Sequence, residues 1–107
     1  MTKPYLLKLS GELGLRGIEA LKAQIAEALA SHDALAIDTS AVEGADASAL
    51  QLLLSAQKTA NADGKVMSLS ASAATPLGRT LVALGLVAAD GAPLVPETST
   101  WTIKAAA

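Results

Sequence analysis

Short apolar runs recur along the chain and predict β-strands. The first covers Tyr5 to Leu9, the second is "ALAID" at 34–38, and the third is "KVMSLS" at 65–70. The second run does not alternate between apolar and polar residues, which is typical of a strand covered on both faces by helices. It is therefore the best candidate for a central parallel strand. The "SGELGLRG" stretch after the first run has the composition of a loop.

Helical periodicity fills the segments between these strands. From Leu15 onward, apolar residues recur at spacings of three and four and predict an amphipathic helix ending at "SHD": Ile18, Leu21, Ile25 and Leu29. Asp46 is a good N-cap for a second helix from Ala47 to about Ala62. Thr75 and Pro76 form a cap and first-position pair for a third helix, and Gly85 occupies its C-terminal position.

The resulting order, β-α-β-α-β-α, predicts a parallel sheet joined by right-handed crossovers in a single domain, residues 1–107. After Gly91 the pattern weakens. The segment "APLVPE" could add an edge strand limited by its prolines, and "TWTIK" could pair with an edge or trail as a tail.

Composition excludes several classes of function. The net charge is −2 and only 2% of the residues are aromatic, which argues against a nucleic-acid surface. The chain has no Cys and one His, so neither thiolate chemistry nor a clustered imidazole site is expected, and we expect no cofactor. The N-terminus lacks a signal-peptide pattern, and "LVALGLVAA" is far shorter than the ~20 residues of a membrane span. The default expectation is a cytoplasmic protein without membrane insertion.

The second helix is predicted to expose a mostly uncharged arc. A helical wheel places on that arc Ser48, Gln51, Leu52, Ser55, Lys58 and Thr59. The opposite arc contains Leu50, Leu53, Leu54 and Ala60, together with Gln57, whose polarity suggests that the helix leaves the core by that point. An exposed arc with a Leu at its centre resembles a contact surface. Locally, Asp46 is sufficiently explained as an N-cap and Ser48 as a small residue in the first turn.

Four segments in order resemble the STAS family, the fold of bacterial anti-sigma-factor antagonists. They are "LKLSGEL", "IDTSAVEGADASAL", "GKVMSLS" and "ATPLGRTLVALGL", which together span residues 6–88 and leave 89–107 as an edge strand or tail. The second segment matches the family's "D-L-S-x-V-x-x-x-D-S-S-G-L" core, including the eight-residue step from Asp38 to Asp46. The resemblance implies an α/β, STAS-like sandwich with a mixed, mostly parallel sheet and helices packed chiefly on one face. Only the second of the family's two opening strands is evident, and "TWTIK" could take the missing edge.

The resemblance also implies a non-enzymatic module whose protein partners dock at the start of the second helix. In many members a Ser or Thr directly after the aspartate is phosphorylated by the partner kinase. This sequence has Ala47 in that slot, Ser48 next, and Ala49 where Gly is usual. Ser48 could serve as a displaced phosphoacceptor, but constitutive binding or regulation elsewhere fits the sequence better.

The candidate docking surface runs from Ala45 to Ser55, with Asp46 as cap and with contacts from Ala47, Ser48, Gln51, Leu52 and Ser55. The resemblance offers three kinds of partner in bacterial signalling and regulation. They are an anti-sigma-factor kinase, the ATPase of a lipid-transport ABC system to which small STAS proteins are accessory subunits, and a chemotaxis or phosphorelay signalling kinase. Members of the first two kinds often keep a hydroxyl after the aspartate, so Ala47 weakens both.

An enzyme is the competing hypothesis. The acids Glu12, Asp38, Glu43 and Asp46 could form a catalytic pair or a Mg²⁺ site in a small hydrolase or nucleotide-binding enzyme. Against this, Asp38 and Asp46 lie at opposite ends of one connection, and no phosphate-binding glycine loop accompanies them. His32 is expected to be solvated at a helix end, while Trp101 could be an exposed recognition group or a cover for a sheet edge.

Overall fold

A computed structural model describes residues 4–104 of the chain. The predicted single domain extends over residues 1–107, so its first three residues and the closing alanines lie outside the described part. The described elements, in chain order, are β1 (Tyr5–Leu13), the 3₁₀ turn η1 (Leu15–Gly17), α1 (Ile18–Ser31), β2 (Ala34–Ala45), α2 (Ala47–Ala62), β3 (Val66–Ser72), α3 (Pro76–Ala83), the 3₁₀ turn η2 (Pro96–Thr98) and β4 (Trp101–Lys104).

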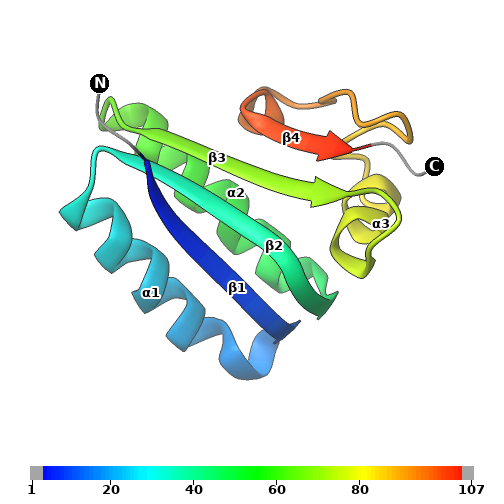
Figure 1. Cartoon of the computed structure of the whole chain (residues 1–107), viewed down its shortest axis with the longest axis horizontal. Coiled ribbons are helices and arrows are strands. Elements are labelled where there is room, and N and C mark those ends of the chain that lie inside the picture. Colours follow the sequence, from blue (N-terminus) through cyan, green and yellow to red (C-terminus); the bar gives the residue numbers. More distant parts are fainter. Residues whose placement is uncertain (1–3, 105–107) are drawn as a thin grey trace.

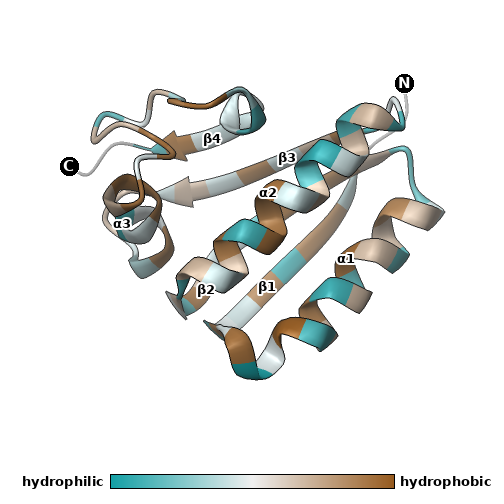
Figure 2. Cartoon of the chain, turned by 180° about the vertical axis from the view of Figure 1, so that it is seen from behind, coloured by the Kyte–Doolittle hydropathy of each residue, from teal (hydrophilic) through white to brown (hydrophobic). Residues whose placement is uncertain are grey.

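The four strands form one sheet in the order β1-β2-β3-β4. All three neighbouring pairs are parallel, so the described sheet is wholly parallel rather than mixed. Figures 1 and 2 show α1 and α2 lying along one face of the sheet, with α3 at the end where β3 finishes. The predicted α/β architecture with helices chiefly on one face is confirmed.

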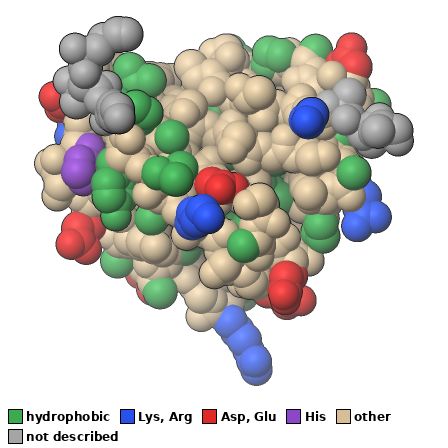
Figure 3. Space-filling view, in the orientation of Figure 1, with side chains coloured by type: hydrophobic (Ala, Val, Ile, Leu, Met, Phe, Trp, Pro, Cys, Tyr) green, Lys and Arg blue, Asp and Glu red, His purple; other side chains and the backbone are tan. Residues whose placement is uncertain are grey.

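The two faces of the sheet differ in burial. Leu7, Ile37, Leu69 and Trp101 are in register across the four strands, and all are buried on the helix side. The neighbouring row, Lys8, Asp38, Ser70 and Thr102, lies on the opposite face, which no described helix covers. In the view of that face, charged side chains are scattered rather than gathered (Figure 3). The expectation that helices cover both faces of β2 is therefore wrong, because its unpatterned run places small alanines, not large apolar residues, on the open side.

Both of the first two strands are longer than predicted. Ser10 to Leu13 continue β1 where the sequence suggested a loop, and β2 runs on to Ala45. The two extensions pair with each other through register shifts between Lys8 and Ser10 and between Gly11 and Glu12. Gly11 has φ +73°, a conformation that favours glycine. The Gly and Ser residues that resembled a loop therefore accommodate an irregular stretch of strand.

The C-terminal segment "TWTIK" supplies β4, which pairs with β3. It occupies the edge opposite β1, so it does not fill the edge at which an additional opening strand would pair. The segment "APLVPE" forms no strand; Pro93 makes an isolated antiparallel bridge with Val87, and Pro96 begins η2. Proline lacks the backbone N–H that a continuous ladder requires.

A buried polar contact connects β4 to α2. Trp101 is buried and its Nε1 donates to Gln57 Oε1 at 2.8 Å. Gln57 is buried too, so the inference that α2 leaves the core there is wrong. The helix stays packed at this point, and the side-chain amide oxygen of Gln57 accepts the hydrogen bond from the buried indole N–H. Of the two alternatives for Trp101, the exposed recognition group is wrong: the side chain is buried and belongs to the edge strand β4.

Candidate functional site

The start of α2 is organised by Asp46. Its backbone is extended (φ −100°, ψ 176°), and its Oδ1 accepts the backbone N–H of Ala49 at 3.1 Å, as an N-cap should. The predicted cap and helix bounds are confirmed. Because Asp46 follows the last residue of β2 directly, the cap fixes the angle at which the chain passes from sheet to helix.

Through its carboxylate and its backbone N–H, Asp46 joins three parts of the chain. Ser48 Oγ donates to Asp46 Oδ1 at 2.5 Å, and the backbone N–H of Leu15 donates to Oδ2 at 3.2 Å. The backbone N–H of Asp46 in turn donates to the carbonyl of Leu13 at 3.0 Å. The Ser48 hydroxyl first, and then the Ala49 amide, lower the pKa of the Asp46 carboxyl from its ordinary value of 3.8. Asp46 therefore serves as an ionised structural cap whose two oxygens are both occupied.

Gly14 makes this arrangement possible, and sequence reasoning missed it. A Cβ on Gly14 would lie 2.8 Å from Asp46 Oδ2. The missing side chain thus leaves room for the carboxylate to reach Leu15. The signal available in the sequence was a glycine next to a predicted strand, which is too common to single out.

The predicted contact residues divide into two groups. Ala47 and Gln51 are exposed beside Asp46, and Ser48 is half-buried with its hydroxyl engaged by the cap. Leu15, which sequence reasoning placed at the start of a helix, adds a side chain that is 73% exposed next to the Asp46 carboxylate. These residues form a nearly uncharged surface around the hydrogen-bonded carboxylate of Asp46.

Leu52 and Ser55 belong to a separate groove between α1 and α2. This groove encloses about 150 Å³ and is lined by Lys22, Ile25, Ala26, Leu29, Leu52, Ser55, Ala56 and Thr59. Leu52 is half-buried there rather than fully exposed as the helical wheel suggested. The difference arises because α1 packs against that side of α2, a contact that the wheel of one helix cannot show.

The acids proposed as an enzyme site do not cluster with Asp46 around a common cavity. Asp38 lies within β2 on the open face, where its Oδ1 accepts the backbone N–H of Ser40 at 2.8 Å; this bond and a weaker one from the Ser40 side chain lower the pKa of Asp38. Glu12 lies beside Gly44 on the neighbouring strand. Within residues 4–104, no group of three or more His, Cys, Asp and Glu side chains is placed to hold a metal ion.

His32 lies where the sequence predicted, exposed at the end of α1. Its ring stacks on Tyr5, with ring centroids 4.3 Å apart and planes 4° from parallel. This contact between the first strand and the end of α1 was not predicted.

The fold agrees with a comparison against known families. A family model described as "Mlab, STAS domain" matches residues 2–96. The chain belongs to the STAS domain family. A search of curated proteins finds no match to the chain.

STAS domains are in general non-enzymatic modules for protein interaction and regulation, so membership of the family indicates an interaction or regulatory module. The position of Asp46, at the junction of β2 and α2, is where the resemblance places partner docking. None of the helices in the described part of this STAS domain is long and apolar enough to cross a membrane.

Proposed function

We propose that this protein is a constitutive docking module that binds a protein partner through the start of α2. The observation that carries the proposal is the state of the two residues after Asp46. Ala47 is exposed and has no hydroxyl, while the hydroxyl of Ser48 is already donated to the cap. The surface therefore offers neutral contacts and no free phosphoacceptor at its centre.

Phosphorylation of Ser48 would conflict with the cap. A phosphate adds a charge of ~−1.5 to −2, and here it would replace a hydroxyl that lies 2.5 Å from the Asp46 carboxylate. Like charges at that separation repel, so the modified side chain must leave the first turn. Ser48 remains the candidate acceptor if the protein is modified at all, but constitutive binding suits the geometry better.

The kind of partner follows from the same argument. An anti-sigma-factor kinase, or another signalling kinase that releases its target by phosphorylation, needs a free hydroxyl on the STAS domain to accept the phosphate. Accessory subunits of a lipid-transport ABC ATPase also often keep a hydroxyl after the aspartate, so Ala47 counts against this partner too, but such an ATPase needs only a contact surface, because an accessory subunit can stay bound. We therefore favour a cytoplasmic accessory subunit of such an ATPase over a phosphorylated antagonist.

Affinity capture of the tagged full chain from its native cells, with intact-mass measurement of the bait, tests this proposal. We expect an ATPase to co-purify with unmodified bait. A co-purifying kinase, together with bait that carries a phosphate on Ser48, would refute constitutive docking and support a phosphorylated antagonist.

Variants locate the surface. Ala47→Asp adds a charge to the exposed centre, while its position in the first turn of α2 is favourable for an acid and should preserve the fold. It should abolish capture, as should Ser48→Asp; Leu52→Asp should do so as well if the docking surface extends into the groove between α1 and α2. Matched controls are Ala23→Asp on the exposed side of α1 and Leu84→Asp at the end of α3, where the leucine is 46% exposed. Capture that survives Ala47→Asp and Leu52→Asp would refute the proposed face.

A further inference from the structure

The edge of β1 is open along nine residues. Among the strands of residues 4–104, β1 pairs only with β2, so one side of its backbone has no strand partner. An edge of this kind presents unpaired N–H and C=O groups and can accept a further strand from another chain.

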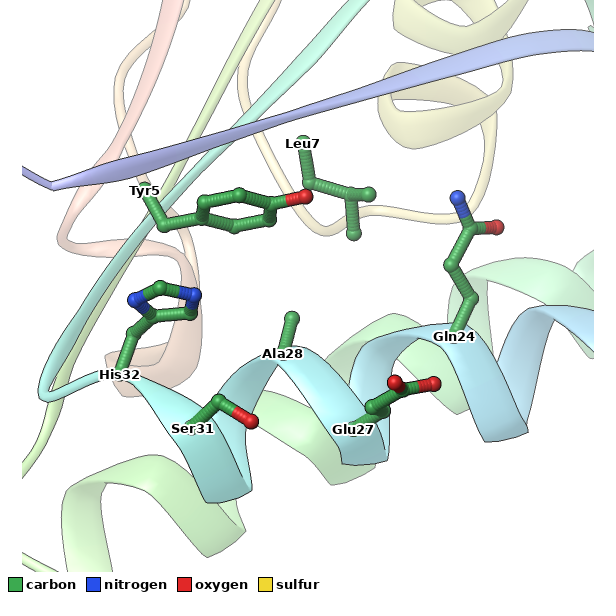
Figure 4. A pocket seen from close by; sticks show the side chains of 7 residues that line it. All are labelled: Tyr5, Leu7, Gln24, Glu27, Ala28, Ser31 and His32. Atoms are coloured by element: carbon green, nitrogen blue, oxygen red, sulfur yellow. The ribbon is translucent and has the colours of Figure 1, made fainter.

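A groove follows this edge between β1 and α1. One cavity of about 230 Å³ is lined by Tyr5, Leu7, Gln24, Glu27, Ala28, Ser31 and His32 (Figure 4). A second cavity of about 230 Å³ is lined by Lys8, Leu9, Ser10, Glu12, Leu13, Gly17, Ala20, Leu21 and Gln24. Gln24 lines both, so the two cavities are neighbours along this edge, and we call them together the β1/α1 groove.

The first cavity has a distinct chemistry. The rings of Tyr5 and His32 stack on each other at one end of the cavity, and the side chains of Gln24, Glu27 and Ser31 extend from α1 (Figure 4). Glu27 is the only acid in the lining, and no Lys or Arg lines it. An acid beside aromatic faces and neutral polar groups is complementary to a cationic side chain.

We propose that the β1/α1 groove binds an extended segment of a protein partner, which adds to β1 as a further strand and places a lysine or arginine in the Glu27 cavity. Successive side chains of a strand point to opposite faces, so alternate residues of the segment face the groove while its backbone pairs with β1. This surface does not include Asp46 or Ala47, so it stands or falls independently of docking at α2.

The test uses a phage-displayed library of random peptides of about eight residues, close to the length of β1, selected on the immobilised full chain. We expect enrichment of peptides with one Lys or Arg within an alternating, β-prone sequence. Titration of an enriched peptide into isotopically labelled protein should shift the amide signals of β1. Absence of enrichment, or shifts confined to the start of α2, would overturn the proposal.

Paired variants separate the groove from general effects. Glu27→Lys should weaken the enriched peptide by about tenfold or more, because it places like charges together. Glu19→Lys, an exposed acid on the same helix that lines neither cavity, should leave binding unchanged. Gln24→Trp should obstruct the groove where the two cavities adjoin and abolish binding, whereas Ala23→Trp should not. Equal binding by Glu27→Lys and Glu19→Lys would refute the cationic site.

Sedimentation of the unmodified chain distinguishes the other possible occupant, a second copy. A monomer that binds the basic peptide supports the proposal. A dimer that Gln24→Trp dissociates would show that β1 pairs with itself and would overturn it.

Discussion

The buried contact between Gln57 and Trp101 should contribute measurably to the stability of the domain. Gln57 Oε1 accepts the indole N–H at 2.8 Å, and both side chains are at most 4% exposed. We consider the variant Gln57→Met, which keeps an unbranched side chain of similar length but cannot accept this bond.

The expected loss of stability comes from the hydrogen-bond donor that Gln57→Met leaves without a partner. The indole N–H of Trp101 stays buried without a partner, which costs about 1–3 kcal/mol. The second amide contact, from Gln57 Nε2 to Asn61 Oδ1 at 3.0 Å, adds little because Asn61 is exposed and can bond to water. For a domain of 107 residues, each kcal/mol corresponds to roughly 4–5 °C in melting temperature. Gln57→Met should therefore lower the melting temperature by about 4–15 °C.

Urea unfolding can be followed by the fluorescence of Trp101, which is the single Trp of the chain, and by circular dichroism. Gln51→Met is the matched control, because Gln51 is exposed on the same helix and its replacement should change the unfolding free energy by less than about 0.5 kcal/mol. Trp101→Phe, alone and combined with Gln57→Met, completes a double-mutant cycle; because these two variants contain no Trp, all four proteins of the cycle are compared by circular dichroism. A Gln57→Met variant as stable as Gln51→Met, or a cycle that is fully additive, would refute the reasoning.

Three further predictions concern the backbone and the cap. Gly14→Ala should lower the melting temperature by roughly 4 °C, because its Cβ would lie 2.8 Å from Asp46 Oδ2. Gly17→Ala is the control and should leave the melting temperature unchanged, because a Cβ there has nothing within 4 Å. Equal melting temperatures for the two variants would contradict this reasoning. Gly78→Ala should prevent normal folding, since its Cβ would lie 1.9 Å from the Ser72 carbonyl oxygen, while Arg79→Ala at the exposed next position should fold normally, as circular dichroism will show. Because the folded pKa of Asp46 is lowered, its contribution to stability is present above the ordinary value of 3.8 and is lost as the pH falls from there through the folded pKa. Unfolding measured from neutral to acid pH should accordingly show a shallower acid decline in Asp46→Asn than in the unmodified chain, and identical slopes would show that the cap is not ionised.

Much of the fold could be predicted because local signals agreed with one another. Asp46, Thr75 with Pro76, and Gly85 each carry a side chain or conformation that marks a helix end, and each has that role in the structure. The parallel order of the strands followed from helices alternating with apolar runs. These signals lie within a few residues of the features they specify, so a single sequence suffices to detect them.

The errors arose where partners distant in sequence decide the structure. Ser10 to Leu13 form a strand because β2 pairs with them, some thirty residues later. Gln57 is buried because Trp101, 44 residues away, needs an acceptor. The groove between α1 and α2 and the cavity at Tyr5 and His32 likewise require knowledge of which helix packs beside which strand, and periodicity within one element does not contain it.

The connection from Leu13 to Leu15 lies between the two proposed binding surfaces and decides which variants can separate them. Leu13 ends β1 and lines the second cavity of the β1/α1 groove, yet its carbonyl accepts the backbone N–H of Asp46. Leu15 is bonded to the Asp46 carboxylate from the other side of Gly14. A change at Gly14 therefore perturbs both surfaces at once, because the same backbone supports the end of the groove and the start of α2. Among the described residues, the side chains of Glu27 and Ala47 take no part in the hydrogen bonds that link the groove to the start of α2. Glu27→Lys and Ala47→Asp are therefore the variants that can assign a binding defect to one surface.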